Sequence, residues 1–200
     1  MGKPGFALLL LSNLWWSQTG QMKDFQKIPD VFDTPENLYP FIKPSKDFAY
    51  WKAFTNHTDP EKAVLYESQY PEPMTILEPA PEQGFFQKCL SENCFHYIIA
   101  CKNDRPEYFA DVKALRKFIG EINNVGEAVL IANTYGYSVD IKNPEGGSFR
   151  KDDSNFYLKT YRSEKCSDVK ESFLLIINIK SGELKVQSRG IYTEKKSCRQ

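Results

Sequence analysis

The chain has 200 residues, which is enough for one domain or for one domain with a substantial appendage. A hydrophobic fraction of 41% and an aromatic fraction of 14% are sufficient for a packed core and exclude global disorder. The formal net charge is +0, and the chain has no basic cluster that would neutralise phosphates, so we expect no nucleic-acid partner.

The first twenty residues have the three zones of a secretory signal peptide. Lys3 supplies a short positive region, Phe6 to Leu11 begins an apolar stretch that extends to Trp16, and residues 17–20 are small or polar. The continuous apolar core is about half of the roughly 20 residues that a membrane-spanning helix needs. We therefore expect cleavage after Thr19 or Gly20 and a secreted or periplasmic mature protein with no membrane span. The alternative is an uncleaved N-terminal helix or a buried segment.

Residues 21–84 are rich in both proline and aromatic residues. Nine of the twelve prolines lie here, which argues against regular sheet because proline lacks a backbone donor. We expect an irregular arm wrapped on the main domain, with short helices. One helix would begin at Pro35 after Thr34, a second would be capped by Ser45 and carry Phe48, Trp51 and Phe54, and a third would run from Pro60 to about Ser68.

Residues 85–136 show clearer signals. Phe95 to Cys101 is an apolar run typical of a strand, and Pro106 to Phe109 is a candidate for its return strand. Asp111 would cap a helix whose apolar side chains recur at helical spacing up to Ile122. Asn124, with Glu127 three residues later, predicts a capping box and a second helix that Gly136 would end.

After Gly136 the hydrophobic period changes from about 3.6 to 2. The alternation predicts strands at Tyr137–Ile141, Phe156–Arg162, Ser172–Ile179 and Leu184–Tyr192, with Gly190 marking a bulge in the last one. These elements predict an α+β fold with two helices packed on one face of an antiparallel sheet, preceded by the irregular Pro-rich arm. The expected division is a signal peptide at 1–20, the arm at 21–84 and the α+β domain at 85–200.

All five cysteines lie beyond the expected signal peptide, in a compartment where thiols tend to pair. Two bridges among five cysteines allow fifteen connectivities. We favour Cys166–Cys198, with Cys89–Cys94 as a local second bridge and Cys101 as the odd cysteine in an apolar strand. A zinc site is not expected, because there is no C-x-x-C and the chain has two histidines.

The segment ALRKFIGEINNVGEAVLIANTYGYSVD at 114–140 resembles a segment of small exported proteins of Bacteroidetes. The resemblance extends to EGGSF at 145–149 and to GIY at 190–192, and it covers the final ~110 residues. It implies a fold type and an exported address. It carries no activity, ligand or catalytic residue, and it does not include the Pro-rich arm.

Candidate reactive groups all have ordinary structural explanations. His96 lies two residues after Cys94 and could face it on one side of a strand, but oxidation of Cys94 would remove the nucleophile. His57 lies in the Asn-x-Thr sequence at 56–58, which we take for a chance match to a glycosylation site. The run from Asp152 to Asn155 lacks the spacing of a calcium loop, and Gly146-Gly147 lacks the lysine of a phosphate-binding loop, so both predict turns.

The function predicted from the sequence is therefore a non-enzymatic binding or structural module, with no cofactor, whose partner is a protein or an envelope component. Trp51, Tyr135 and Tyr137 are the candidates for surface aromatic contacts, although packing in the core would explain them equally well. The alternatives are an envelope hydrolase with carboxylates drawn from loops, and an inhibitor or immunity-like protein with a protruding loop at Pro144–Asp153.

Overall fold

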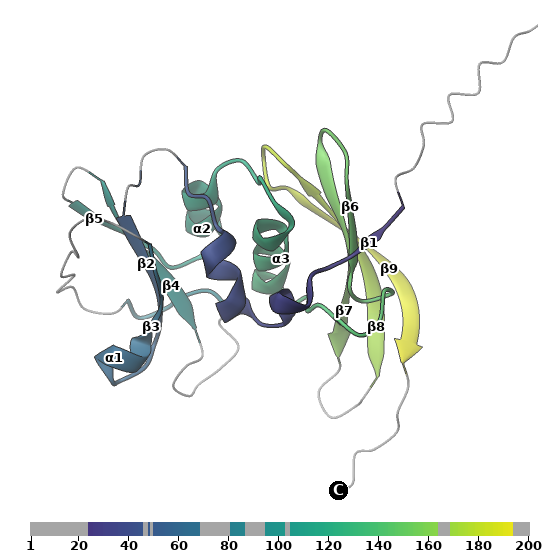
Figure 1. Ribbon diagram of the computed structural model, residues 1–200, viewed down its shortest axis with the longest axis horizontal. Coiled ribbons are helices and arrows are strands. Elements are labelled where there is room, and N and C mark those ends of the chain that lie inside the picture. Colours follow the sequence, from purple (N-terminus) through teal and green to yellow (C-terminus); the bar gives the residue numbers. More distant parts are fainter. Residues whose placement is uncertain are drawn as a thin grey trace, which may run out of the picture.

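The computed structural model describes residues 24–45, 48, 50–68, 81–86, 95–102, 105–163 and 169–193. The expected signal peptide lies outside these ranges. Within them the protein is a mixed α and β structure with two antiparallel sheets, and its two longest helices lie between the sheets (Figure 1).

The five-stranded sheet has the order β1-β6-β7-β8-β9. Its strands are β1 (Gln26–Lys27), β6 (Ser148–Lys151), β7 (Asn155–Ser163), β8 (Lys170–Asn178) and β9 (Leu184–Thr193). The four-stranded sheet has the order β3-β2-β4-β5. Its strands are β3 (Val64–Glu67), β2 (Tyr50–Thr55), β4 (His96–Lys102) and β5 (Arg105–Phe109).

The helical elements are two 3-10 helices, η1 (Asp30–Asp33) and η2 (Pro35–Phe41), and three α-helices, α1 (Pro60–Ala63), α2 (Val112–Ile119) and α3 (Val125–Thr134). The cap predictions at Asp111 and Asn124 are confirmed. The Asp111 side chain accepts a hydrogen bond of 2.8 Å from the backbone N–H of Ala114, and Asn124 and Glu127 form the reciprocal capping box of α3. Gly136 follows α3 with φ +80°, the left-handed conformation that glycine adopts without a steric penalty.

One hydrophobic core joins the two sheets through the helices. Phe118 of α2 is fully buried and packs edge-on against Trp51 of β2 at 5.2 Å between ring centroids. On the other side, the backbone N–H of Ile122 donates to the carbonyl oxygen of Ile179, just after β8. The helices therefore contact both sheets, whereas the sequence predicted that they would cover one face of a single sheet.

The prediction of an irregular arm with short helices holds in part for the described residues of 21–84: η2 begins at Pro35 after Thr34 as predicted, but the segment also contributes β2 and β3 to a regular sheet. The helix expected after Ser45 is instead β2, which pairs along its whole length with β4. In β2 the side chains of Trp51, Ala53 and Thr55 are buried and those between them less so, which is the period of a strand. The predicted helix at Pro60 forms but ends at Ala63, and β3 follows it directly.

The strands predicted in the second half are confirmed, with one exception. Gly190 lies at a register shift between β8 and β9, as a bulge requires. The exception is Tyr137–Ile141, where one bridge between Ser138 and Tyr161 is followed by turns. The side chain of Asp140 accepts a hydrogen bond from the backbone N–H of Lys142 and so turns the chain away from the sheet.

Candidate functional site

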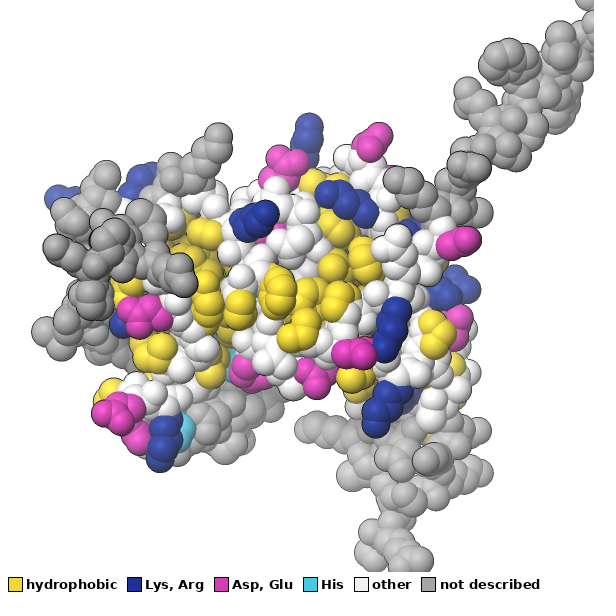
Figure 2. Space-filling model, in the orientation of Figure 1, with side chains coloured by type: hydrophobic (Ala, Val, Ile, Leu, Met, Phe, Trp, Pro, Cys, Tyr) yellow, Lys and Arg dark blue, Asp and Glu magenta, His cyan; other side chains and the backbone are white. Residues whose placement is uncertain are grey.

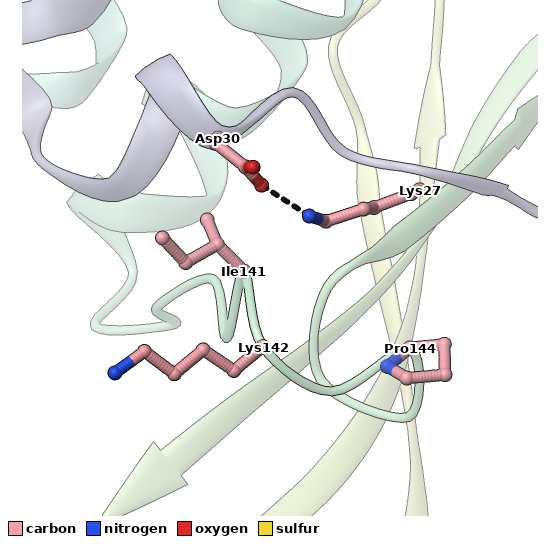
Figure 3. Close-up of a pocket in the computed structure, with 5 residues that line it drawn as sticks. All are labelled: Lys27, Asp30, Ile141, Lys142 and Pro144. Atoms are coloured by element: carbon pink, nitrogen blue, oxygen red, sulfur yellow. Dashed lines mark ion pairs between the residues drawn. The ribbon is translucent and has the colours of Figure 1, made fainter.

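A hollow of about 670 Å³ opens between the N-terminal segment and the loop that precedes β6. Lys27 and Asp30 form an ion pair on one side of the hollow, and Lys142 and Pro144 lie on the other side. Ile141 lies between Asp30 and Lys142 (Figure 3). Two apolar side chains and three charged ones thus share one recess.

Strand pairing brings the two sides of the hollow together. β1 pairs with β6, and the backbone N–H of Ile28 donates to the carbonyl oxygen of Gly147 at 2.9 Å. The Ile28 side chain is fully buried, whereas Lys27 and Asp30 are exposed on either side of it. The N-terminal segment is therefore anchored by Ile28 and presents its two charges to the hollow.

The loop at 140–147 is held by a polar cluster around Asp140. The Asp140 carboxylate lies 2.6 Å from the Lys170 Nζ and accepts a hydrogen bond of 3.0 Å from the Tyr192 hydroxyl. Burial alone would raise the pKa of Asp140, but the bonds from Lys170 and Tyr192 lower it below its ordinary value. A side chain at Gly147 would overlap the backbone of Asp140. The turn that the sequence predicted at Pro144–Gly147 is confirmed, and at Gly147 it also brings two backbone segments close together.

An exposed apolar surface adjoins the hollow. We call it the apolar band and define it as Val31 of η1 with Pro40 and Phe41 of η2. Val31 is 48% exposed and Phe41 is 41% exposed, although each directly precedes a buried core residue. Figure 2 shows hydrophobic side chains gathered across the middle of the face that carries η1 and η2. An apolar centre with a charged rim is the anatomy of a protein-binding surface.

The strongest cluster of titratable groups lies elsewhere, around His96 of β4. His96 is buried, with its Nδ1 2.7 Å from the Tyr39 hydroxyl and its Nε2 3.4 Å from a carboxylate oxygen of Glu36. The hydrogen bond from His96 lowers the pKa of Glu36 to about 2, and burial raises the pKa of Tyr39. Tyr39 is fully buried and Glu36 is about half exposed, so this chain of groups runs from the core to the surface. Its role is to fasten η2 to β4.

The structure separates the three aromatic residues proposed for surface contacts. Tyr135 is 37% exposed, but Trp51 and Tyr137 are buried. Trp51 fills the space between Phe118 and Tyr66, and the Tyr137 ring is covered by the guanidinium of Arg162 at 3.8 Å. The surface prediction is wrong for Trp51 and Tyr137, because Trp51 belongs to β2 and packs under α2 and the Tyr137 ring packs against the five-stranded sheet.

Four of the cysteines, Cys89, Cys94, Cys166 and Cys198, lie outside the described residues, and so do both proposed bridges and the pairing of Cys94 with His96. Cys101 is buried in β4, where the sequence placed it. In the part of the chain that the structure describes, no three His, Cys, Asp or Glu side chains are grouped to hold a metal ion.

The remaining candidates have structural roles. Asp152 accepts hydrogen bonds from the backbone N–H groups of Ser154 and Asn155, which makes the polar turn between β6 and β7. His57 accepts a hydrogen bond from the backbone N–H of Asp59. The side-chain oxygen of Asn56 accepts a hydrogen bond from the backbone N–H of Phe95.

Sequence reasoning missed the hollow and the apolar band. Val31 and Phe41 stand as isolated apolar residues near prolines, which is only a weak indication of an exposed apolar surface. No pattern in the sequence indicates that Lys27 and Lys142 line the same hollow. No family model, curated protein or solved structure matches the chain. Within the ranges given above, no helix is both long and apolar enough to cross a membrane.

Proposed function

We propose that this protein is an exported, non-enzymatic binding module that holds a partner protein on the hollow and the apolar band. The observation that carries this proposal is that exposed Val31 directly follows Asp30, which lines the charged recess, while exposed Phe41 packs on Phe32, the next residue along. The signal-like N-terminus and the resemblance to exported Bacteroidetes proteins support the exported address.

The lining of the site indicates the chemistry of the partner. Lys27 is neutralised by Asp30, whereas Lys142 has no ion-pair partner among the described residues. A partner surface with an apolar centre and one carboxylate placed to reach Lys142 would complement both features. Large apolar side chains at the centre of an interface contribute most of the binding energy, so Phe41 and Val31 are the residues on which affinity should depend.

No specific observation favours the two alternatives. A hydrolase needs two carboxylates near each other in a recess, and in this hollow Asp30 is the acidic side chain and is paired with Lys27. An inhibitor with a protruding loop at Pro144–Asp153 would need that segment to stand away from the body. Instead its first residues pack against Asp140 and the next ones form β6.

The chain offers a matched pair of valines for the test. Val31 of η1 and Val64 of β3 are both exposed, at 48% and 37%, but lie on different parts of the molecule. A photo-crosslinking residue at position 31, and separately at position 64, should be introduced into the full chain in its native host. A defined protein adduct formed from position 31 and not from position 64 is the expected result.

The partner protein identified in that adduct should then be recovered with the Val31→Glu variant in about tenfold lower amount, whereas the Val64→Glu variant should recover as much of it as the wild type. Equal adducts from both positions, or none from position 31, would contradict the proposal. Sequencing the mature N-terminus of the exported protein tests the address separately, and an intact Met1 would refute it.

A further inference from the structure

The strand β9, yellow in Figure 1, is the edge strand of the five-stranded sheet at the opposite end of the strand order from β1. It is ten residues long and pairs with β8 on one side. On its other side no strand of the described ranges lies against it. An edge of this kind presents backbone N–H and carbonyl groups to any chain that can take an extended conformation.

The side chains of β9 divide into two faces. Val186 lies opposite Leu175 and Ile191 opposite Glu171, so both point to the face that carries the helices. The helices do not cover them, since Val186 is 42% exposed and Ile191 62% exposed. Lys185 lies opposite Ile176 and therefore points to the other face.

A second hollow adjoins this edge. It has a volume of about 260 Å³ and is lined by Phe173 and Ile191, with Arg162 and Glu171 beside them. Arg162 is fixed in place, because it stacks on Tyr137 and donates a hydrogen bond of 2.6 Å to the carbonyl oxygen of Tyr135. The hollow is therefore a recess with apolar side chains and with one cation, Arg162, and one anion, Glu171, in its lining.

All the charged side chains of β9 are basic. Lys185 and Arg189 are exposed, the strand contains no acidic residue, and neither cation has an ion-pair partner among the described side chains. Basic side chains discourage the edges of two similar chains from pairing. The same charges attract an acidic strand.

We propose that β9 binds an extended, acidic segment of a partner polypeptide, which adds to the sheet as an antiparallel or parallel strand. Alternate apolar side chains of that segment would pack beside Val186 and Ile191, with one of them in the hollow at Phe173. The acidic side chains between them would lie over Lys185 and Arg189. The residues that line this surface are not those that line the hollow at Lys142, so substitutions at Lys185, Arg189 and Ile191 test this proposal without altering the lining of that hollow.

The test uses three synthetic peptides as long as β9 and labelled with a fluorophore. The first alternates valine with glutamate, the second alternates valine with lysine, and the third is the first with prolines at alternate positions. Fluorescence anisotropy with the full mature chain at low salt should show saturable binding of the glutamate peptide. The lysine peptide should bind at least about tenfold more weakly, and the proline peptide should not bind because it cannot complete the ladder.

Two variants decide where the peptide binds. Lys185→Glu combined with Arg189→Glu should abolish the preference for the glutamate peptide, whereas Lys113→Glu, an exposed cation on α2, should leave it unchanged. Ile191→Asp should weaken binding without changing the far-UV spectrum. No saturable binding, or binding that the double variant leaves intact, would overturn the proposal. Dimerisation of the wild-type chain that Ile191→Asp abolishes would also overturn it, because the edge would then be taken by a second copy.

Discussion

A carboxylate oxygen of Glu36 lies 3.4 Å from Nε2 of the buried His96, and this contact ties the N-terminal segment to the centre of the four-stranded sheet. Glu36 is half exposed and His96 almost fully buried, so the pair joins a surface group to a core group. The hydrogen bond favours the ionised carboxylate, which is why the pKa of Glu36 falls from 4.5 to about 2.

This contact predicts a pH dependence of stability. A carboxyl group whose pKa is lower in the folded state stabilises the fold above its unfolded pKa and loses that contribution as the pH falls through the folded value. The difference in free energy of unfolding between wild type and Glu36→Gln should therefore be present above pH 4.5 and vanish between pH 4.5 and about 2. Urea titrations across this range measure it. A difference that stays constant with pH would show that the contact has no electrostatic part.

Glu127 should be the most sensitive polar residue of the core. Its side chain is fully buried and accepts backbone hydrogen bonds from Lys43 at 2.7 Å and from Asn123 at 2.6 Å, besides closing the capping box with Asn124. Glu127→Ala leaves these donors unsatisfied and should destabilise the protein by about 3 kcal/mol. Glu127→Gln keeps one acceptor oxygen and should cost about 1 kcal/mol. Denaturant titration of both variants is the measurement, and equal losses would contradict the argument.

Phe118 should be the residue that holds the helices to the four-stranded sheet. It is fully buried against Trp51, Phe48 and Phe109, with ring centroids 5.0 to 5.5 Å away. Phe118→Ala should cost about 3–5 kcal/mol through lost burial and a cavity. Tyr135→Ala, an exposed aromatic at the end of α3, should cost less than about 1 kcal/mol. Thermal unfolding followed by the fluorescence of Trp51 measures both losses. A small effect at Phe118 would mean that the helices pack mainly on the other sheet.

Gly147 should tolerate no side chain, whereas Gly190 should tolerate one at moderate cost. A Cβ at Gly147 would overlap the backbone of Asp140, so Gly147→Ala should destabilise the protein by about 3 kcal/mol and displace Lys142 and Pro144 from the hollow. A Cβ at Gly190 meets no atom within 4 Å, and the cost there comes from φ +90° alone, about 1 kcal/mol. Denaturant titration compares them. The amount of partner protein that is crosslinked to position 31 should fall in the Gly147→Ala variant and should not fall in the Gly190→Ala variant.

Local signals predicted the middle and the end of the chain well. The caps at Asp111 and Asn124 depend on neighbouring residues alone, and so does the alternation in β7 and β8, which is why those predictions are confirmed. β2 was missed because Trp51 and Phe54 are three residues apart and suggest a helix. The small Ala53, fully buried against its neighbours, carries the true period of two.

Local sequence patterns could not predict the candidate site, for a different reason. Its two sides, Lys27 with Asp30 and Lys142 with Pro144, are far apart in the sequence and meet through the pairing of β1 with β6. β1 is two residues long, which is too short for the alternation of apolar and polar residues that identifies a strand in a sequence. The loop conformation also depends on Lys170 and Tyr192, which come later still in the chain. A contact between segments so far apart forms through the assembled sheet, and no local sequence pattern predicts it.

The pairing of β1 with β6 also constrains the order in which the chain can mature. A polypeptide leaves the ribosome, or a translocation channel, with its N-terminus first. Its opening residues then wait without their partner strand until more than half of the molecule has emerged. Ile28, Phe32 and Leu38, near the start of the described chain, are buried in the folded protein. β1 cannot take its place in the sheet before β6 has emerged, so the native position of the first described residues depends on the second half of the chain.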